Sequence, residues 1–218
     1  TRHTLDFAVR CKAKKFLMTS SGSVYGKAPV GMTHITEDYS GAPSNMDFVG
    51  SSLGEGKRVA EFFCAYYGEK HGFDVQIARC FSFVGPYQPL DIHYAVGNFI
   101  RDALYSDAIT VNGNGAPMRS YMYVGDLVIW LLTLLVKGRS GSVYNVGSDQ
   151  AISIRELAHL VRDTLSPGKE VSILGQSDIG VGGDWYVPSI QCARTELGLE
   201  VWTPLQEAIR LTAEAATP

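Results

Sequence analysis

Apolar side chains recur at helical spacing in the stretch from residue 52 to residue 70. Val59, Phe62, Phe63, Tyr66 and Tyr67 stand at positions i, i+3, i+4, i+7 and i+8. This spacing puts them on one face of an amphipathic helix. We therefore predict a helix over this stretch, with its apolar face packed against a core.

Short apolar runs predict strands that alternate with helices. A strand at residues 16–19 precedes the long helix, and a second strand at 75–81 follows it. Such alternation favours an α/β fold with a mainly parallel sheet. The other expected elements are helices near residues 5–9, at 95–105 and at 154–164, and strands at 109–111, 121–124 and 142–146.

Local signals predict where several elements turn, begin or end. Residues 112–115 read Asn-Gly-Asn-Gly, which is typical of a hairpin turn. Asp126 is the expected N-cap of an apolar helix that ends at Gly138, and we expect that helix to be buried. Ser153 and Glu156 have the spacing of a capping box at the start of the following helix.

Composition indicates a globular protein with no charge-driven partner. The 218 residues are 45% hydrophobic, and the net charge of −3 gives no reason to expect nucleic acid or an anionic membrane. The apolar run at 127–136 is shorter than the roughly 20 residues of a membrane span. No signal peptide is visible at the start, so we expect a cytoplasmic protein. The histidines and cysteines show no metal-ligand spacing, and we expect no metal site.

Polar residues in two places could carry chemistry. Hydroxyl side chains at 20–23 follow the first strand, and strand ends are where open α/β sheets bind ligands. Lys57 lies on the next helix, one turn after Leu53, and the long loop at 26–50 lies between. A serine can donate to a substrate oxygen while a lysine holds a cofactor ribose. A simple turn cluster and a solvated helix lysine are the alternatives.

The order of several motifs resembles the extended short-chain dehydrogenase/reductase family, which contains NAD-dependent nucleotide-sugar epimerases and dehydratases. Residues 20–26 (SSGSVYG) resemble its Ser/Thr-VYG motif, and residues 54–61 (GEGKRVAE) resemble its catalytic helix. The matches span nearly the whole chain. They imply a partial Rossmann-like, doubly wound parallel sheet with a smaller α/β substrate lobe. The other matching stretches are 79–86, 113–127, 144–147 and 193–198.

The resemblance also implies roles for individual residues. It implies NAD as the cofactor of the complete relative and a nucleotide-diphosphate sugar as the ligand. Arg119 would contact the diphosphate, unless it is a surface ion-pairing residue, and Asn98 would contact substrate, unless it caps a helix. The implied residues are Ser21 and Lys57 for catalysis, Thr19, Ser20, Lys57, Phe81 and Pro86 for cofactor binding, and Ser21, Ser82, Asn98 and Arg119 for substrate binding.

Three departures from the family pattern limit the expected activity. Leu53 stands four residues before Lys57, where the family has its catalytic tyrosine, and leucine cannot exchange a proton. No acidic residue lies between Ser21 and Val24, which disfavours dehydratase and decarboxylase chemistry and favours an epimerase. The glycine-rich turn that holds the pyrophosphate is missing, together with roughly a hundred residues of a typical domain, so this chain alone lacks that part of an NAD site. We expect either a fragment or a cofactor-poor remnant.

We therefore interpret the chain as part of a nucleotide-sugar epimerase-like protein that acts by NAD-dependent hydride transfer and is inactive or impaired as written. A non-catalytic member that binds a nucleotide sugar or a partner is the alternative, so enzyme activity stays open. We expect residues 1–85 to form the second half of the dinucleotide-binding domain, with 119–147 returning to it. Residues 86–118 and 148–218 would form the substrate lobe, and the helices of the sheet domain would form a homodimer.

Overall fold

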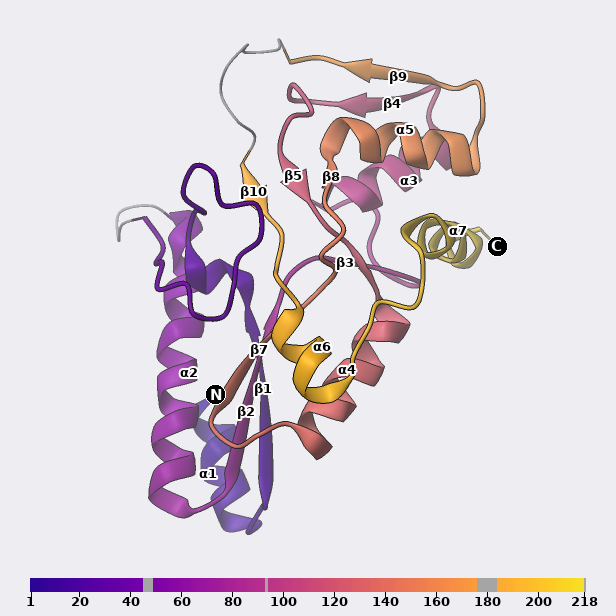
Figure 1. Ribbon diagram of the computed structural model, residues 1–218. Coiled ribbons are helices and arrows are strands. Elements are labelled where there is room, and N and C mark those ends of the chain that lie inside the picture. Colours follow the sequence, from indigo (N-terminus) through magenta and orange to yellow (C-terminus); the bar gives the residue numbers. More distant parts are fainter. Residues whose placement is uncertain (45–48, 93, 176–183, 218) are drawn as a thin grey trace.

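Three parallel strands form the central sheet of the protein, for which we have a computed structural model that describes residues 1–44, 49–92, 94–175 and 184–217. The strand order is β1-β2-β7 (Figure 1). In this register Ser21, the last residue of β1, lies opposite Cys80, the last residue of β2. The strands are β1 (Lys15–Ser21), β2 (Asp74–Cys80) and β7 (Ser142–Val146).

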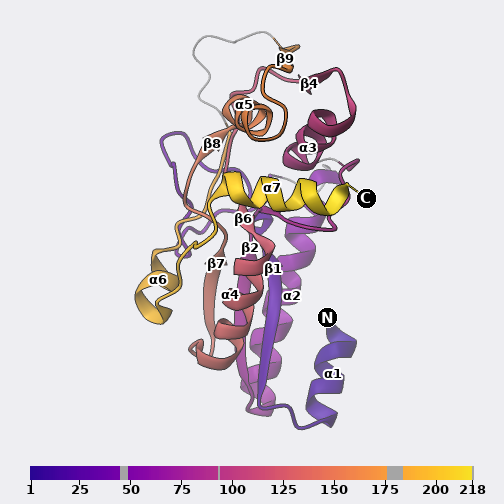
Figure 2. The same cartoon turned by 90° about the vertical axis from the view of Figure 1, so that its right-hand side faces the viewer.

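Helices cover both faces of this sheet (Figures 1 and 2). Helix α2 packs on one face of β1 and β2, with α1 beside it, and Leu5, Cys64 and Ile77 belong to the core between them. Helices α4 and α6 pack on the other face, where Trp130 and Tyr144 are fully buried. The helices are α1 (Arg2–Arg10), α2 (Ser52–His71), α4 (Val124–Lys137) and α6 (Gln191–Leu197).

A second core lies beyond the end of the sheet where β1 and β2 finish (Figure 1). Helices α3, α5 and α7 pack together there, and the parallel pair β4 and β9 packs on α5. Ile100, Leu157 and Ile209 are fully buried in this core. The elements are α3 (Ala95–Tyr105), α5 (Ile154–Leu165), α7 (Leu205–Ala216), β4 (Ala108–Val111) and β9 (Glu170–Ile173).

Short strands connect the two cores. Strand β5 lies between β10, to which it is parallel, and β8, to which it is antiparallel, while β3 pairs with β6. Two 3₁₀ turns, η1 (Gly22–Tyr25) and η2 (Val49–Ser51), flank the long loop that precedes α2. The strands are β3 (Phe83–Val84), β5 (Met118–Arg119), β6 (Met122–Tyr123), β8 (Ile152–Ser153) and β10 (Trp185–Tyr186).

The predicted α/β class with a parallel sheet is confirmed. The capping box is confirmed as well, because the Ser153 side chain accepts from the Glu156 amide and the Glu156 carboxylate accepts from the Ser153 amide. Residues 190–199, which the predicted division assigns to the lobe, pack on the sheet through Ile190, Ala193 and Leu199. None of the helices in the described residues is long and apolar enough to cross a membrane.

The predicted core face of α2 is wrong for most of its residues. Val59 is 53% exposed, Phe62 is 66% exposed and Tyr66 is 46% exposed, while Phe63 and Tyr67 pack at the edge of the core. The side of α2 that meets the sheet carries smaller residues, Gly54, Ala60 and Cys64, together with the polar Glu61. Small side chains let the helix lie close to the strands, so the large aromatic side chains face outward.

The expected hairpin at 112–115 is not formed. Strand β4 pairs with β9, far along the chain, and not with β5, which follows the turn. The Asn-Gly signal predicts a local turn but does not identify the partner of a strand. Gly115 does adopt a positive φ of 75°, and a Cβ there would lie 2.7 Å from the Cβ of Arg155. The turn therefore brings the chain against α5.

Helix α4 differs from its prediction in start and burial. It begins at Val124 with Tyr123 as N-cap, so Asp126 lies in the first turn, where its carboxylate accepts from the backbone amides of Trp202 and Thr203. The helix is buried on one face only. Trp130 and Leu134 lie in the core, but Val128, Ile129, Leu132 and Val136 are each at least half exposed.

Candidate active site

The side chains of Ser20 and Ser21, the last two residues of β1, point in different directions, because side chains alternate along a strand. Ser20 is buried, and its hydroxyl donates to Glu61 Oε1 of α2 at 2.5 Å. Ser21 caps η1 and accepts from the Ser23 amide at 3.1 Å, and the two hydroxyl oxygens, Ser21 Oγ and Ser23 Oγ, are 2.9 Å apart. The turn-cluster interpretation therefore holds for Ser21 in addition to any functional role. A cofactor contact from Ser20 would have to come from its backbone.

Lys57 reaches from α2 to the same strand end. Its Nζ donates to the carbonyl oxygen of Thr19 at 2.7 Å. Leu53 lies one turn earlier and is 57% exposed. The lysine is therefore held at the carboxyl end of β1, as its predicted role requires, and the position expected to carry the tyrosine offers no polar atom.

A buried polar network fixes α2 against the sheet beneath this lysine. Arg79 of β2 binds Glu61 through two hydrogen bonds, Nη2 to Oε2 at 2.7 Å and Nε to Oε1 at 3.0 Å. The Arg79 guanidinium also lies 4.6 Å from the centre of the Tyr25 ring. Tyr25 donates to Asn145 Oδ1 at 2.8 Å, and burial raises the pKa of Tyr25 to about 12. The Tyr25 hydroxyl is thus engaged by Asn145 of β7 and is not free to replace a tyrosine at position 53.

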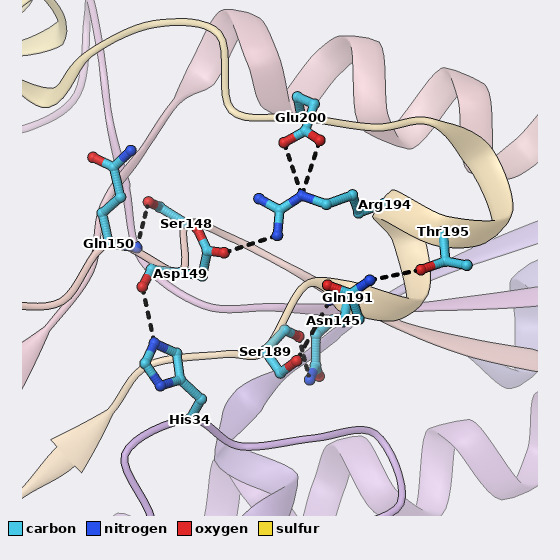
Figure 3. A network of polar contacts seen from close by, with 10 residues as sticks. All are labelled: His34, Asn145, Ser148, Asp149, Gln150, Ser189, Gln191, Arg194, Thr195 and Glu200. Atoms are coloured by element: carbon cyan, nitrogen blue, oxygen red, sulfur yellow. Dashed lines mark hydrogen bonds and ion pairs between the residues drawn. The ribbon is translucent and has the colours of Figure 1, made fainter.

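The long loop after η1 is anchored to the far side of the sheet (Figure 3). His34 Nε2 lies 2.9 Å from the carbonyl oxygen of Asp149, which follows β7. Asn145 of β7 donates through Nδ2 to the Ser189 carbonyl at 3.2 Å, and Arg194 of α6 pairs with the Asp149 carboxylate at 3.1 Å. These contacts connect His34, the end of β7 and the segment after β10, so the part of the loop around His34 is tied to the β7 edge of the sheet.

Arg119 approaches the site from the short strands that connect the two cores. It lies in β5 directly opposite Tyr186 of β10. Its Nη2 lies 3.1 Å from Asp184 Oδ2, and its Nη1 donates to the carbonyl oxygens of Asp184 and Met118, each at 2.8 Å. The ion-pairing interpretation of Arg119 therefore holds in addition to any binding role. The pair is only partly buried, so an anionic ligand can compete for the guanidinium.

Arg119, Asp184, Trp185 and Tyr186 line one wall of an open cleft of about 560 Å³. The opposite wall comes from η1 and from the residues that flank the long loop, among them Ser23. A cleft with a few convergent polar groups is the usual form of a small-molecule site. The cleft lies beside the end of β1, because Ser23 belongs to the turn that Ser21 caps.

Tyr186 was not predicted as a site residue. Its ring centroid is 4.7 Å from that of Phe81, its hydroxyl lies within hydrogen-bonding reach of Ser21, and the Arg119 guanidinium is 5.9 Å from its ring centre. A two-residue strand has too few positions to show a pattern, so the signal for Tyr186 is absent from the local sequence.

The remaining predicted residues lie in different places. Asn98 lines a second cavity of about 500 Å³ between α3 and the segment 108–117, apart from the cleft of Arg119. It lies inside α3 and is not a helix cap. Ser82 offers its carbonyl oxygen to the Met122 amide, and Pro86 follows β3. Their binding roles stay predictions.

The residues present fit one end of an NAD molecule. Lys57, held at the Thr19 carbonyl, has the position and charge to bind ribose hydroxyls at the carboxyl end of β1. The 218 residues contain no glycine-rich turn for the pyrophosphate. The fit is therefore limited to the nicotinamide-ribose side.

The model of the NAD dependent epimerase/dehydratase family matches residues 1–147. The chain belongs to this family. Members among the curated proteins include UDP-glucuronic acid decarboxylase 1 of Xenopus tropicalis, 34% identical over 214 residues, and UDP-glucuronic acid decarboxylase 6 of Arabidopsis thaliana, 34% identical over 216 residues. These matches cover 97% and 98% of the chain but 49% and 60% of the relatives. The chain thus spans about half to three fifths of their length.

Solved structures of the family share the fold. UDP-glucose 4-epimerase of Thermotoga maritima with UDP-glucose superimposes with a TM-score of 0.82 at 24% identity, covering 97% of the chain and 66% of that structure. The dTDP-glucose 4,6-dehydratase of Bacillus anthracis in complex with NAD gives 0.81 at 21% identity, covering 98% and 64%. In each comparison the matched part is about two thirds of the solved chain. The similarity shows a Rossmann-like α/β fold.

The curated family members named above are decarboxylases, although the sequence pattern favours an epimerase. The similarity in sequence therefore does not single out the epimerase branch. The structure adds a physical reason why an acidic side chain is missing beside Ser21: a Cβ on Gly22 would lie 2.7 Å from the Tyr186 hydroxyl and 2.8 Å from the Phe81 ring. Position 22 has no room for a side chain while Tyr186 is in place.

Proposed function

We propose that this chain is the substrate-binding part of a nucleotide-sugar epimerase-like protein with little or no turnover. The observation that carries the proposal is the arrangement at the end of β1. Ser21 ends β1, Lys57 of α2 donates to Thr19 of the same strand, and Arg119 lines the cleft that Ser23 of the next turn also lines. Leu53 leaves the expected position of the general base without an ionisable group. Binding groups are present and the proton acceptor is missing.

Each group has a chemically defined part in this proposal. Bound NAD would take a hydride from the carbon that bears a sugar hydroxyl and return it to the other face. Lys57 would hold the nicotinamide ribose, Ser21 would hydrogen-bond the sugar oxygen, and Arg119 would exchange Asp184 for the diphosphate. With Leu53 in place of a tyrosine, the hydroxyl proton has no acceptor at position 53.

The second cavity supports a nucleotide ligand. Asn98, Thr110 and Asn112 offer polar groups around it, and Phe99 and Ile154 offer apolar surface. This mixture suits a nucleoside, which has both a flat ring and hydrogen-bonding edges. We therefore propose that the nucleoside lies between α3 and the segment 108–117 and the sugar lies in the cleft beside Tyr186, with the diphosphate at Arg119.

Thermal unfolding with a panel of UDP-, dTDP-, GDP- and CDP-sugars, each with and without NAD, tests binding. A ligand that binds the folded chain raises its unfolding temperature in a concentration-dependent way. We expect at least one nucleotide sugar to do so. If no member of the panel raises the unfolding temperature, the proposed binding function is wrong.

Restoring the tyrosine tests the proposed cause of low turnover. In the complete protein, Leu53→Tyr is expected to raise epimerase turnover by orders of magnitude, because it returns a phenol one turn before Lys57. Leu53→Phe, which adds the ring without the hydroxyl, is the matched control and should leave turnover unchanged. Unchanged turnover in Leu53→Tyr would show that position 53 is not the site of the missing base.

Two assignments of organisation accompany this proposal. Residues 1–85 with 119–147 would form the cofactor-side domain, and 86–118 with 148–218 the substrate lobe.

The exposed Val59, Phe62 and Tyr66 on α2 would form a homodimer contact, because a contiguous apolar helix face is costly to leave in water. Sedimentation of the chain and of Phe62→Glu tests this contact, since the charge should shift a dimer to monomers.

A further inference from the structure

A smaller cavity, of about 380 Å³, lies where the two cores of the protein meet. Its lining residue Val201 packs on the sheet core, while Leu160 and Leu205 pack on the core of α3, α5 and α7. Among the described residues, it shares no lining residue with the cleft of Arg119 or with the cavity of Asn98. Small ligands often bind in cavities of this size at the junction of two packed units. The cavity is therefore a candidate for a separate binding site.

Two buried residues that line this cavity have hydroxyl groups with unused hydrogen-bonding capacity. Tyr121 is 8% exposed, and its hydroxyl has no hydrogen-bonding partner in the part of the chain that the structure describes. Ser148 is 2% exposed, and its Oγ accepts from the Gln150 amide at 3.1 Å (Figure 3). Within the described ranges no group accepts the Ser148 proton. A buried hydroxyl without a partner lowers the stability of the folded state, so both groups are open to a ligand that accepts hydrogen bonds.

The charge around the cavity is negative. Glu156 lines it, and the described lining residues include no lysine, arginine or histidine. The hydroxyl and the amide of Ser153 donate to Glu156 Oε2 at 2.7 Å and 2.9 Å, and these bonds lower the pKa of the carboxyl group. Asp126 lies behind the lining residue Thr203, whose hydroxyl donates to it at 3.1 Å. The cavity therefore repels an anionic ligand, while Glu156 can accept from a ligand hydroxyl.

We propose that this cavity binds an uncharged ring compound rich in hydroxyl groups, a free sugar, at a place apart from the proposed nucleotide-sugar site. A sugar hydroxyl donates and accepts at once, so the ligand can accept from Tyr121 and Ser148 and donate to Glu156. The C–H groups of the ring would pack on the aliphatic side chains of Ile152 and Leu160. A ligand in this place contacts both cores. The inference does not depend on the proposed function, because the two sites have different lining residues.

Methyl NMR of the chain with glucose, xylose, N-acetylglucosamine and glucuronate tests the site. The methyl signals of Leu160 and Leu205, which line the cavity, report binding at the proposed place. We expect at least one uncharged sugar to shift both signals with a dissociation constant of about 1–10 mM. Glucuronate, which adds a carboxylate to the glucose ring, should bind at least about fivefold more weakly than glucose. No shift by any uncharged sugar would overturn the proposal, and equal binding of glucuronate would overturn the preference for an uncharged ligand.

Two tyrosine variants separate ligand binding from folding. Tyr121→Phe keeps the ring in its core and removes only the hydroxyl. We expect about three- to tenfold weaker sugar binding and no decrease in the unfolding temperature, because the hydroxyl has no partner within the described chain. Tyr144→Phe is the matched control, since it removes a buried tyrosine's hydroxyl that donates to Glu196 at 2.7 Å. It should lower the unfolding temperature and leave sugar binding unchanged. Unchanged sugar binding in Tyr121→Phe, or a decrease in its unfolding temperature equal to that of Tyr144→Phe, would overturn the role of Tyr121 as a ligand contact.

Discussion

The two walls of the candidate site differ in what they offer a ligand. The α2 wall holds Lys57 at the Thr19 carbonyl and presents the half-exposed Leu53, where the proposal expects a tyrosine. The β5–β10 wall presents Arg119 and Tyr186 side by side from neighbouring strands. One wall offers an ammonium group beside an apolar side chain, and the other offers a guanidinium beside a phenol that lines the cleft.

The position of α2 is fixed by contacts away from residue 53. Under α2, Ser20, Glu61 and Arg79 form a closed set of hydrogen bonds that fixes the helix to β1 and β2. The comparison teaches that the framework that positions this wall does not depend on the side chain at position 53.

The largest expected effect comes from breaking the frame of the α2 wall. Glu61→Ala leaves the Arg79 guanidinium, whose side chain is 16% exposed, without its carboxylate. Removing one partner of a buried ion pair costs about 3 kcal/mol of unfolding free energy, measured by urea denaturation. Glu69→Ala, an exposed residue of the same helix, is the control. A loss below about 1 kcal/mol in Glu61→Ala would mean that the pair does not hold the helix.

A smaller effect is expected where Asp184 competes with a ligand for Arg119. Asp184→Asn removes the carboxylate at 3.1 Å and leaves the guanidinium free for a diphosphate. An exposed ion pair contributes little free energy, so the gain should be small. We expect UDP to bind the variant about two- to fivefold more tightly than the unmodified chain in low salt, as measured by calorimetry. Asp163→Asn removes a comparable exposed carboxylate beside Arg162 and should have no effect. Weaker binding in Asp184→Asn would show that Asp184 assists the ligand.

The smallest expected effect is the pH dependence of sugar binding. The pKa of Tyr186 is raised to about 12 by burial, so its hydroxyl keeps its proton well above neutral pH. The charged or titratable neighbours are Arg119, Tyr94 and Cys80, and burial raises the pKa of Cys80 to about 11. The affinity for UDP-glucuronic acid should therefore be flat between about pH 7 and about pH 9. A decrease in this window that vanishes in Tyr186→Phe would show that the phenol ionises early.

Much of the framework could be predicted from sequence because its signals are local. The bounds of α2, α3 and β7 follow from apolar periodicity, and the start of α5 follows from Ser153 and Glu156. The outward face of α2 could not be predicted, because periodicity shows that Phe62 and Tyr66 share a face but not which face meets the sheet. The small Ala60 and Cys64 decide that, through packing with β1 and β2.

Some residues of the candidate site could likewise be predicted from the sequence, and others could not. The strand end with Ser21 and the helix with Lys57 are close in sequence and carry family motifs, so they could be named in advance. Tyr186 meets Ser21 only because β10 pairs with β5 and brings the lobe over the sheet. The same tertiary contact explains Gly22, whose lack of a side chain has no visible reason until Tyr186 is placed beside it.

The proposed nucleotide-sugar site at β5 and β10 is tested most directly by calorimetry. UDP-glucuronic acid is titrated into the chain and into its Arg119→Ala variant. We expect binding to the unmodified chain and a loss of about ten- to a hundredfold in the variant, the effect of removing a charge-assisted contact. Arg210→Ala, which removes an exposed arginine of α7 paired with Glu207, should bind like the unmodified chain. Equal affinity in Arg119→Ala, or no binding by the unmodified chain, would contradict the account.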